Sequence, residues 1–315
     1  MISLSIVIPV YNGARSIERL VNELATLKID GGVEVLLVND CSPDDSWAVI
    51  QRICAAAPMP VIAIDLARNF GEHNAVMAGY ASSSGRYIIN IDDDFQNTPA
   101  EVERLYRHAV ANDQLDVVYT FYPRKQHSFV RNLGSKFNNA VANVLLDKPK
   151  WLYLSSFRCV NRFLCDRVLM YTGPYPYIDG LILENTQRIG RLEVEHAPRA
   201  EGTSGYTLRK LVRLWLIMFV NFSVMPLRFS SVVGLVFSCA GFLMAIYAVI
   251  DRFRNDTPEG WASIVSVILV FAGIQLLILG LIGEYLGRLY LMQKGKPQYS
   301  ARTMITAPGT PAPRT

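Results

Sequence analysis

The sequence predicts an α/β domain with a mostly parallel sheet, followed by an interfacial helix and a two-helix transmembrane hairpin. Within residues 1–205, short apolar runs rich in β-branched residues alternate with helical patterns, which is typical of parallel sheets covered by helices. Residues 206–228 are basic, aromatic and aliphatic. Two long segments without charged residues follow, and 51% of the chain is hydrophobic, which is high for a soluble protein.

The expected strands are five clear apolar runs and two weaker ones that follow them. They are residues 4–10, 33–39, 60–66, 86–92 and 115–121, and then residues 153–160 and 191–197. Apolar residues at helical spacing predict helices such as residues 14–27 and 99–112. In a sheet of this kind, ligands bind at the carboxyl ends of the strands.

Polar side chains follow the first, second and fourth of these strands. Pro9, Tyr11 and Asn12 end the first strand, Asp40 follows the second, and three consecutive aspartates end the fourth. We therefore expect these side chains to lie along one edge of the sheet. The chain contains neither a GxGxxG fingerprint nor a GxxxxGK[ST] loop, so phosphate groups must be bound in another way.

The three aspartates, Asp92, Asp93 and Asp94, indicate a metal site. Like charges this close together repel one another unless a cation or strong hydrogen bonds stabilise them. In an extended segment Asp92 and Asp94 point to the same face, and carboxylate oxygens are preferred ligands of Mg²⁺ or Mn²⁺. Such a metal would neutralise a departing diphosphate. The alternative is that the aspartates only cap the helix that begins near Thr98.

The C-terminal third predicts two transmembrane helices, at about residues 229–250 and 261–283. Both lack charged residues, and at 1.5 Å per residue each is about 33 to 36 Å long, enough to cross a hydrocarbon core of about 30 Å. The alternative is a buried helical hairpin in a soluble core. Residues 206–228 predict an amphipathic helix at the bilayer surface, and the tail of residues 293–315 is expected to be disordered.

Charges beside the two spans predict their orientation. The flanking basic residues are Arg209, Lys210, Arg213 and Arg228 before the first span, and Arg288, Lys294 and Lys296 after the second. The loop between the spans has no excess of basic over acidic residues. By the positive-inside rule, the α/β domain and both termini face the cytoplasm, so we expect a multi-pass protein of the inner (cytoplasmic) membrane.

The formal net charge of +4 is modest. We attribute it to anionic lipid and substrate phosphates, and expect no nucleic-acid partner. Glycines in the spans allow packing against a neighbouring helix and hence a homo-oligomer.

Six segments in this order resemble the polyprenyl-phosphate glycosyltransferases, inverting enzymes with the GT-A fold that include dolichol-phosphate mannose synthase and undecaprenyl-phosphate aminoarabinose transferases. They are IVIPVYN (6–12), LLVNDCSPDDS (36–46), LARNFGEHNAVMAG (66–79), IDDDFQNTP (91–99), EGTSGYTLRKL (201–211) and IGEYLGRLY (282–290). The resemblance covers nearly the whole chain. It implies transfer of a sugar from a nucleotide-diphosphate sugar, expected to be UDP-linked, to undecaprenyl phosphate, for cell-envelope glycans such as lipopolysaccharide or O-antigen.

The resemblance also implies roles for single residues. The donor-binding residues would be Pro9, Tyr11, Asn12, Asp40, Asp92 and Asp93, with Asp40 accepting a hydrogen bond from the base. The metal ligands would be Asp92, Asp94 and Gln96. The acceptor phosphate would be bound by Arg124, Arg131, Ser135 and Arg199, because a guanidinium group can contact two phosphate oxygens at once. The catalytic residues would be Asp92, Asp94 and Arg131.

Two departures from the family's pattern bear on the chemistry. Gly13 stands where many members carry glutamate. Positions 152 and 153 are apolar or aromatic, where some relatives carry an aspartate that would act as general base. A phosphate monoester is ionised at neutral pH, with a second pKa of about 6, whereas a sugar hydroxyl needs a base far more. The missing acid favours a phosphate acceptor, although Asp93 or Asp179 remain candidate bases.

Two alternatives to this function stay open. The first is a glycosyltransferase that acts on the hydroxyl of a lipid-linked saccharide. The second is a non-catalytic membrane scaffold that binds a nucleotide sugar.

Overall fold

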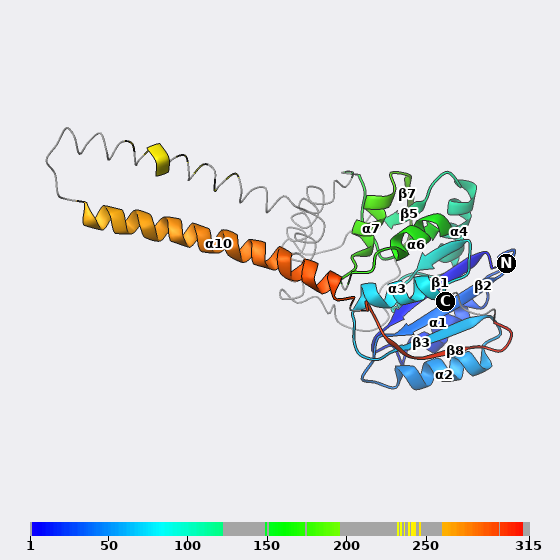
Figure 1. Cartoon of the computed structure of the whole chain (residues 1–315). Helices are drawn as coiled ribbons and strands as arrows, with labels where there is room; N and C mark the ends of the chain where they lie inside the picture. The colour runs from blue at the N-terminus through cyan, green and yellow to red at the C-terminus, as the bar shows by residue number, and fades with distance from the viewer. Residues whose placement is uncertain are drawn as a thin grey trace. The chain divides into compact units, whose positions relative to one another are not determined.

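The structure is a computed structural model that describes residues 2–121, 149, 151–173, 175–195, 260–295 and 297–310, with single positions between 232 and 246. The chain divides into two compact units, Met1–Leu211 with Gly295–Thr315, and Val212–Lys294. The first unit contains the sheet, and its C-terminal strand, red in Figure 1, comes from the far end of the chain.

The first unit is built on an eight-stranded sheet with the order β7-β5-β6-β4-β1-β2-β3-β8. The strands are β1 (Leu4–Val10), β2 (Val33–Asn39), β3 (Val61–Leu66), β4 (Tyr87–Asn90), β5 (Val117–Phe121), β6 (Arg158–Asn161), β7 (Ile189–Glu193) and β8 (Ala301–Thr306). Strands β4, β1, β2 and β3 are parallel, whereas β6 and β8 run antiparallel to their neighbours. This mixed, mostly parallel sheet confirms the predicted α/β class.

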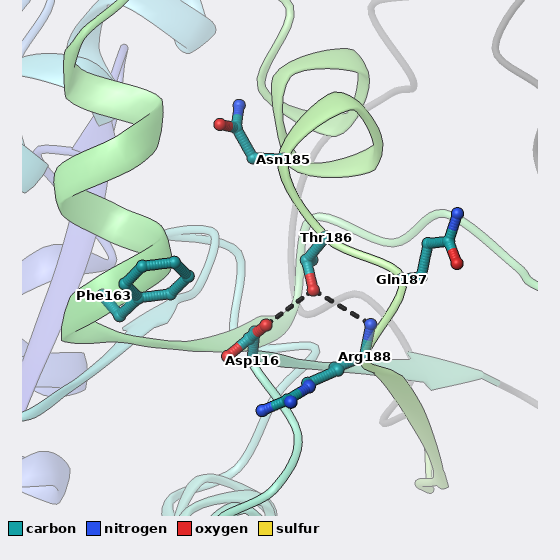
Figure 2. Close-up of a pocket in the computed structure, with 6 residues that line it drawn as sticks. All are labelled: Asp116, Phe163, Asn185, Thr186, Gln187 and Arg188. Atoms are coloured by element: carbon teal, nitrogen blue, oxygen red, sulfur yellow. Dashed lines mark hydrogen bonds between the residues drawn. The ribbon is translucent and has the colours of Figure 1, made fainter.

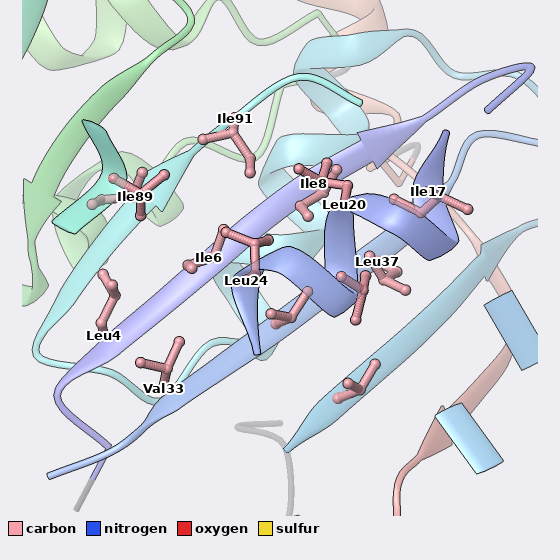
Figure 3. Close-up of a cluster of buried hydrophobic side chains, with 14 of the residues drawn as sticks. Leu4, Ile6, Ile8, Ile17, Leu20, Leu24, Val33, Leu37, Ile89 and Ile91 are labelled. Atoms are coloured by element: carbon pink, nitrogen blue, oxygen red, sulfur yellow. The ribbon is translucent and has the colours of Figure 1, made fainter. Parts of the chain in front are cut away.

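Helices pack on both faces of the sheet. They are α1 (Ile17–Leu24), α2 (Ser46–Ala56), α3 (Glu72–Ser82), α4 (Pro99–Ala111), α6 (Arg162–Leu169) and α7 (Ile178–Asn185). Helices α1, α2 and α4 share one core with alternate residues of the strands. Figure 3 shows Ile6 and Ile8 of β1 with Leu20 and Leu24 of α1, all fully buried. The period of two in the strand and of about 3.6 in the helix brings these side chains together.

Helix α3 covers the other face of the sheet, where Gly79 lies against Val7 of β1. A Cβ atom at Gly79 would overlap the Val7 side chain, so glycine lets the helix approach the strand closely. Helices α6 and α7 pack beside α3.

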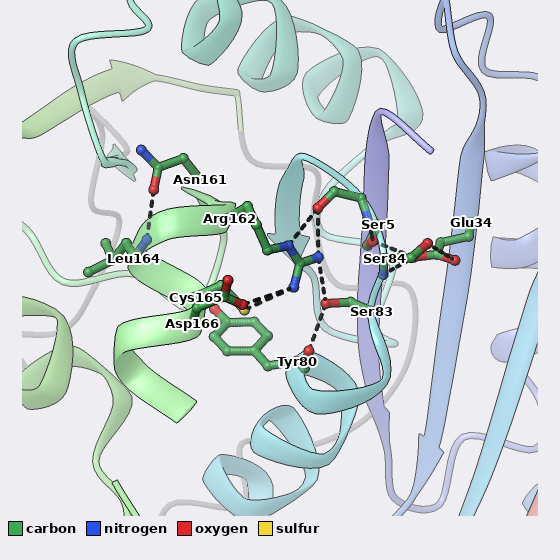
Figure 4. A network of polar contacts seen from close by, with 11 residues as sticks. Ser5, Glu34, Tyr80, Ser83, Ser84, Asn161, Arg162, Leu164, Cys165 and Asp166 are labelled. Atoms are coloured by element: carbon green, nitrogen blue, oxygen red, sulfur yellow. Dashed lines mark hydrogen bonds and ion pairs between the residues drawn. The ribbon is translucent and has the colours of Figure 1, made fainter. Parts of the chain in front are cut away.

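A buried polar network fixes the connection between α3 and β4 (Figure 4). The Glu34 carboxylate accepts hydrogen bonds from Ser5 Oγ (2.5 Å), from the Ser84 backbone N–H (2.6 Å) and from Ser84 Oγ (2.9 Å). The Gly85 N–H donates to Ser5 Oγ (2.8 Å), and Arg162 Nε donates to the Gly85 carbonyl (2.9 Å). The buried charge of Glu34 is thus satisfied by several donors, as burial requires.

The C-terminal tail differs from its prediction. Residues 301–306 are expected to be disordered, and this is wrong, because they form β8 and pair with β3 from Ile62↔Thr306 to Leu66↔Ala301. The pairing extends at both ends, where Ala67 N donates to Ser300 O and Ala307 N donates to Val61 O, each at 2.8 Å. Without β8, β3 would present unpaired backbone groups at the sheet edge.

The second unit contains α10 (Trp261–Gln293), a helix of 33 residues. Within the described part of the chain, it is the helix that is long and apolar enough to cross a membrane, with its apolar window at Val270–Gly287. It continues ten residues beyond the predicted span of 261–283. The predicted interfacial helix (206–228) lies outside the described residues, and so does most of the first predicted span.

Candidate functional site

Three segments with polar residues meet at one edge of the sheet. Strands β4, β1 and β2 are neighbours and parallel, so their carboxyl ends lie side by side. Backbone pairing continues past the strand ends, with Asp40 N donating to Val10 O (3.0 Å) and Ile91 N donating to Val7 O (3.2 Å). The structure therefore places the Tyr11–Gly13 segment, Asp40 and the Asp92–Asp94 segment along one edge.

Each of these segments contains a non-glycine residue with a left-handed backbone. The residues are Asn12 (φ 60°), Cys41 (φ 53°) and Phe95 (φ 61°). Such conformations are costly for residues with a side chain and persist where surrounding contacts enforce them, often at functional sites. Phe95 is held by its ring, which lies 4.6 Å below the guanidinium of Arg19 on α1.

The acidic residues lie in a turn and not in the strand. Strand β4 ends at Asn90, two residues before the predicted end, so the expected extended geometry of Asp92 and Asp94 is wrong. Asp92 Oδ2 accepts a hydrogen bond from Ser156 Oγ (2.9 Å), and Asp94 Oδ1 accepts one from the Gln96 backbone N–H (3.2 Å). The predicted roles of Asp94 and of the Gln96 side chain as metal ligands stay predictions.

The turn is electrostatically strained. Burial, together with the carboxylates of Glu72 and Asp94, raises the pKa of Asp92 to about 7. Burial, together with Asp92 and Asp94, also raises the pKa of Asp93 to about 7. Ionising the whole turn at neutral pH is therefore unfavourable unless positive charge is supplied nearby.

A divalent cation fits this turn. Asp93 Oδ2 is buried and has no hydrogen-bond partner within the described residues, and the crowded carboxylates are hard oxygen donors that suit Mg²⁺ or Mn²⁺. No group of three or more His, Cys, Asp or Glu residues that could enclose a metal is found in the described part of the chain. Asp92 and Asp94 stay the predicted ligands of such an ion.

Asp40, which is predicted to contact the nucleotide base, accepts two hydrogen bonds from the protein backbone. Its Oδ1 accepts a hydrogen bond from the Phe70 N–H (2.7 Å), and its Oδ2 accepts one from the Gly71 N–H (2.9 Å). These bonds fix the start of α3, and only 4% of Asp40 is exposed. Each carboxylate oxygen can accept a second hydrogen bond, so the predicted contact with a base stays a prediction.

A buried ion pair lies close to the acidic turn. Arg158 on β6 pairs with Asp179 on α7, and the same Asp179 oxygen accepts a hydrogen bond from Tyr119 Oη (2.9 Å). Arg158 also interacts electrostatically with Asp92. These contacts orient the Arg158 guanidinium, and the predicted role of Asp179 as a candidate base stays a prediction.

His73 and Glu72 lie near the site but are not among the site residues predicted from the sequence. The His73 ring contacts Tyr177 edge-on, with centroids 5.2 Å apart, and burial lowers the His73 pKa to about 4. His73 is therefore neutral at physiological pH. Glu72 on the first turn of α3 is exposed and adds negative potential at Asp92. Their place within the NFGEHNA segment is the one sequence signal that points to them.

The predicted acceptor residues cannot be located in the structure. Arg124, Arg131, Ser135 and Arg199 all lie outside the described residues, so their contact with the acceptor phosphate stays a prediction.

A pocket of about 520 Å³ lies elsewhere in the first unit (Figure 2). It is lined by Asp116, Phe163, Asn185, Thr186, Gln187 and Arg188. Asp116 and Thr186 bond to each other at 2.6 Å. Asp116 directly precedes β5, and residues 186–188 directly precede β7. This is the sheet edge opposite the aspartates, so this pocket is not part of the candidate site.

Comparison with known proteins identifies the family. The profile of Glycosyl transferase family 2 matches residues 5–171, which contain all three polar segments. The chain belongs to this family of glycosyltransferases. The profile named GtrB C-terminal hairpin matches residues 225–289, which include the predicted spans, and associates this glycosyltransferase with a membrane.

Curated relatives align over almost the whole glycosyltransferase. The undecaprenyl-phosphate 4-deoxy-4-formamido-L-arabinose transferase of Proteus mirabilis is 33% identical over 308 residues, with 96% of this chain and 93% of the relative covered. The enzyme of the same name from Serratia proteamaculans is 35% identical over 312 residues, covering 96% and 93%. These matches confirm the resemblance drawn from the six sequence segments.

Solved structures show the same fold for the first unit. Glucosyl-3-phosphoglycerate synthase from Mycobacterium tuberculosis, in complex with Mn²⁺, UDP and glucosyl-3-phosphoglycerate, superposes with a TM-score of 0.51 at 19% identity, covering 70% of this chain and 79% of that one. Its complex with Mn²⁺, UDP and phosphoglyceric acid gives 0.52 at 18% identity, covering 69% and 76%. The predicted GT-A fold is confirmed.

Proposed function

We propose that this protein is a membrane-anchored, metal-dependent inverting glycosyltransferase that moves a sugar from a UDP-sugar to undecaprenyl phosphate. The reaction would take place at the cytoplasmic face of the inner membrane. The observation that carries the proposal is the meeting of the acidic turn with the Tyr11–Gly13 segment and Asp40 at one sheet edge. The names of the curated relatives support the acceptor.

The donor would bind across the carboxyl ends of β1, β2 and β4. Pro9, Tyr11 and Asn12 would line the nucleotide pocket, and Asp40 would contact the base. UDP in the structures of the M. tuberculosis synthase supports the choice of nucleotide, although identity to that enzyme is low.

A divalent cation would bind beside the donor diphosphate. Asp92 and Asp94, with Gln96, would hold Mg²⁺ or Mn²⁺, which when bound acts as a Lewis acid for the departing diphosphate. Mn²⁺ in the related structures supports this part of the proposal.

The acceptor would attack without a side-chain base. A phosphate oxygen of undecaprenyl phosphate forms the new bond to the anomeric carbon, while the bond from that carbon to the UDP oxygen breaks on the opposite face, so the configuration inverts. Arg124, Arg131, Ser135 and Arg199 would orient the phosphate. The commitment of Asp179 to Arg158 supports an acceptor that is already ionised.

A donor screen tests the proposed function. The purified full-length protein in detergent is incubated with Mn²⁺, undecaprenyl phosphate and a panel of nucleotide sugars, and the extracted lipid is measured by mass spectrometry. We expect a lipid monophosphate sugar from at least one UDP-linked donor, and the mass increment identifies the sugar. UDP-4-deoxy-4-formamido-L-arabinose belongs in the panel because of the relatives' names.

Two other outcomes correspond to the open alternatives. A product formed only when a lipid-linked saccharide is supplied would indicate a hydroxyl acceptor. Nucleotide-sugar binding without any extractable glycolipid, with every donor and acceptor, would indicate the scaffold.

A further inference from the structure

The carboxylate of Asp93 lies directly against Gly13. A Cβ atom on Gly13 would overlap Asp93 Oδ2 and would lie 2.8 Å from Val10 Cγ1, which is closer than real Cβ atoms approach other atoms. Gly13 is buried and its φ is not positive. The need for glycine at this position therefore comes from the space that Asp93 and, to a lesser extent, Val10 occupy, and not from backbone conformation.

The environment of the Asp93 carboxylate is unusual, because one of its oxygens is buried without a hydrogen-bond donor in the described part of the chain. Its Oδ2 is buried without a hydrogen-bond partner within the described residues, which is costly for a polar atom. The carboxylate also accepts backbone hydrogen bonds from its own N–H and from the N–H of Tyr11. Asp93 thus reaches from the turn after β4 to the backbone of the segment after β1.

The segment after β1 is also fixed by the loop between β2 and α2. The Gly13 N–H donates to Ser46 Oγ (3.0 Å), and the Ala14 N–H donates to Asp44 Oδ2 (3.2 Å). Asp44 Oδ1 in turn accepts a hydrogen bond from Ser46 Oγ (2.5 Å). All three segments of the candidate site are therefore linked through residues 11–14.

We propose that Asp93 is a positioning residue, whose carboxylate fills the space left by Gly13 and ties the acidic turn to the Tyr11–Gly13 segment. The metal ligands and the nucleotide-binding residues are then held as one unit that recognises a nucleoside diphosphate together with a divalent cation. The inference rests on the proposed function, because it requires a donor diphosphate at this edge of the sheet.

Three variants of the full-length protein test this contact: Gly13→Ala, Asp93→Ala and the double variant. UDP affinity in the presence of Mn²⁺ is measured by titration calorimetry, and the midpoint of thermal unfolding is measured without ligands. We expect each single variant to weaken UDP binding about tenfold. In the double variant the added methyl group meets only Val10 and no carboxylate, so Gly13→Ala should weaken UDP binding less in the Asp93→Ala background than in the unmodified protein.

A fourth variant separates positioning from simple packing. Gly13→Glu in the Asp93→Ala background returns a carboxylate to the contact from the Gly13 side. We expect it to recover part of the UDP affinity lost in Asp93→Ala. Gly190→Ala is the matched control, because its Cβ would crowd Leu115 Cδ1 at 2.5 Å in β7, away from the site, and should leave UDP affinity unchanged.

Two results would overturn the proposal: unchanged UDP affinity in Asp93→Ala, or an effect of Gly13→Ala that is equally large with and without Asp93. The unmodified protein provides a separate test of the proposed function. If it binds no UDP, that function fails, whereas non-additive unfolding midpoints in the four-member cycle would still show that Gly13 and Asp93 are coupled.

Discussion

Carboxylates at the end of β4 set the chemistry at the scale of single residues. Burial and mutual repulsion raise the pKa values of Asp92 and Asp93 to about 7. A bound cation would therefore stabilise the ionised carboxylates of this turn. The neighbouring Arg158 carries a positive charge, but it is paired with Asp179 and is not free to neutralise the turn. The metal therefore becomes the expected partner of Asp92 and Asp94.

Replacing Asp94 with alanine should remove a metal ligand. We expect Asp94→Ala to weaken Mn²⁺ binding and to lower turnover, each by about 100-fold or more. Calorimetric titration with Mn²⁺ and the glycolipid assay measure the two effects. Asp30→Ala is the control, because Asp30 is exposed and lies before β2, and a variant of Asp94 that binds Mn²⁺ normally would contradict the assignment.

Asp179 has a structural role that can be separated from catalysis. Asp179→Asn leaves Arg158 buried without its counter-charge, which should lower the free energy of unfolding by about 3 kcal/mol. We expect the folded variant to keep kcat within about tenfold, because a phosphate acceptor needs no base. A loss of kcat by a factor of about 1000, with normal stability, would instead identify Asp179 as the general base.

His73 makes the stability of the fold depend on pH. Its pKa is about 4 in the folded protein and about 6.5 in an unfolded chain, so the unfolded state binds more protons between these values. Stability therefore falls as the pH drops from about 6.5 to 4, by at most about 3 kcal/mol.

The variant His73→Gln isolates this contribution. Asp92 and Asp93, whose folded pKa values are raised, contribute in the opposite direction in both proteins. Urea unfolding at pH 7 and pH 5 should therefore show a smaller loss of stability at pH 5 in the variant than in the unmodified protein. Equal losses in the two proteins would refute the assignment.

At the scale of elements, β8 completes the sheet. It covers the edge of β3, and most of its side chains are exposed to solvent. Ile305 packs against the main core cluster, whereas the neighbouring Met304 is 42% exposed. Ile305 and Met304 are therefore a matched pair of apolar side chains in one strand, one packed against the core and one exposed.

Substitution of this pair tests whether β8 belongs to the folded domain. Ile305→Ser should lower the free energy of unfolding by about 1–2 kcal/mol, and Met304→Ser should change it by less than about 0.5 kcal/mol. Thermal or urea unfolding of the full-length protein in detergent measures both. If the two variants were equally stable, β8 would not be docked in solution.

At the scale of the whole molecule, β8 also constrains membrane topology. Strands β3 and β8 lie in one sheet, so residues 61–66 and 301–306 are on the same side of any membrane. The chain between them must therefore cross the bilayer an even number of times. Helix α10 is long and apolar enough to supply one crossing, and the predicted span at 229–250 would supply the other.

This topology can be tested with single-cysteine labelling in membrane vesicles. We expect cysteines placed at Thr257 and Thr310 to react from opposite sides, with position 310 on the cytoplasmic side. Labelling of the two positions from the same side would contradict the hairpin. The glycolipid assay confirms that the labelled proteins are folded.

Much of the fold was predictable because its signals are local. Short apolar runs rich in β-branched residues located β1 to β5, and charge-free length located α10. Polar residues after three strands located the edge that carries the candidate site. The end of β4 was placed two residues too late, because the hydrophobic pattern continues to Ile91 while the backbone already turns.

The sequence alone determined the α/β class and the acidic cluster after the fourth strand, and it predicted the membrane hairpin, because each depends on residues close together in the chain. The tertiary structure decided three other features: the contact of Asp93 with Gly13, the pairing of Arg158 with Asp179, and the addition of β8 to the sheet. Each joins segments that are separated in sequence, so the space and the backbone partners that they share exist only after the chain has folded.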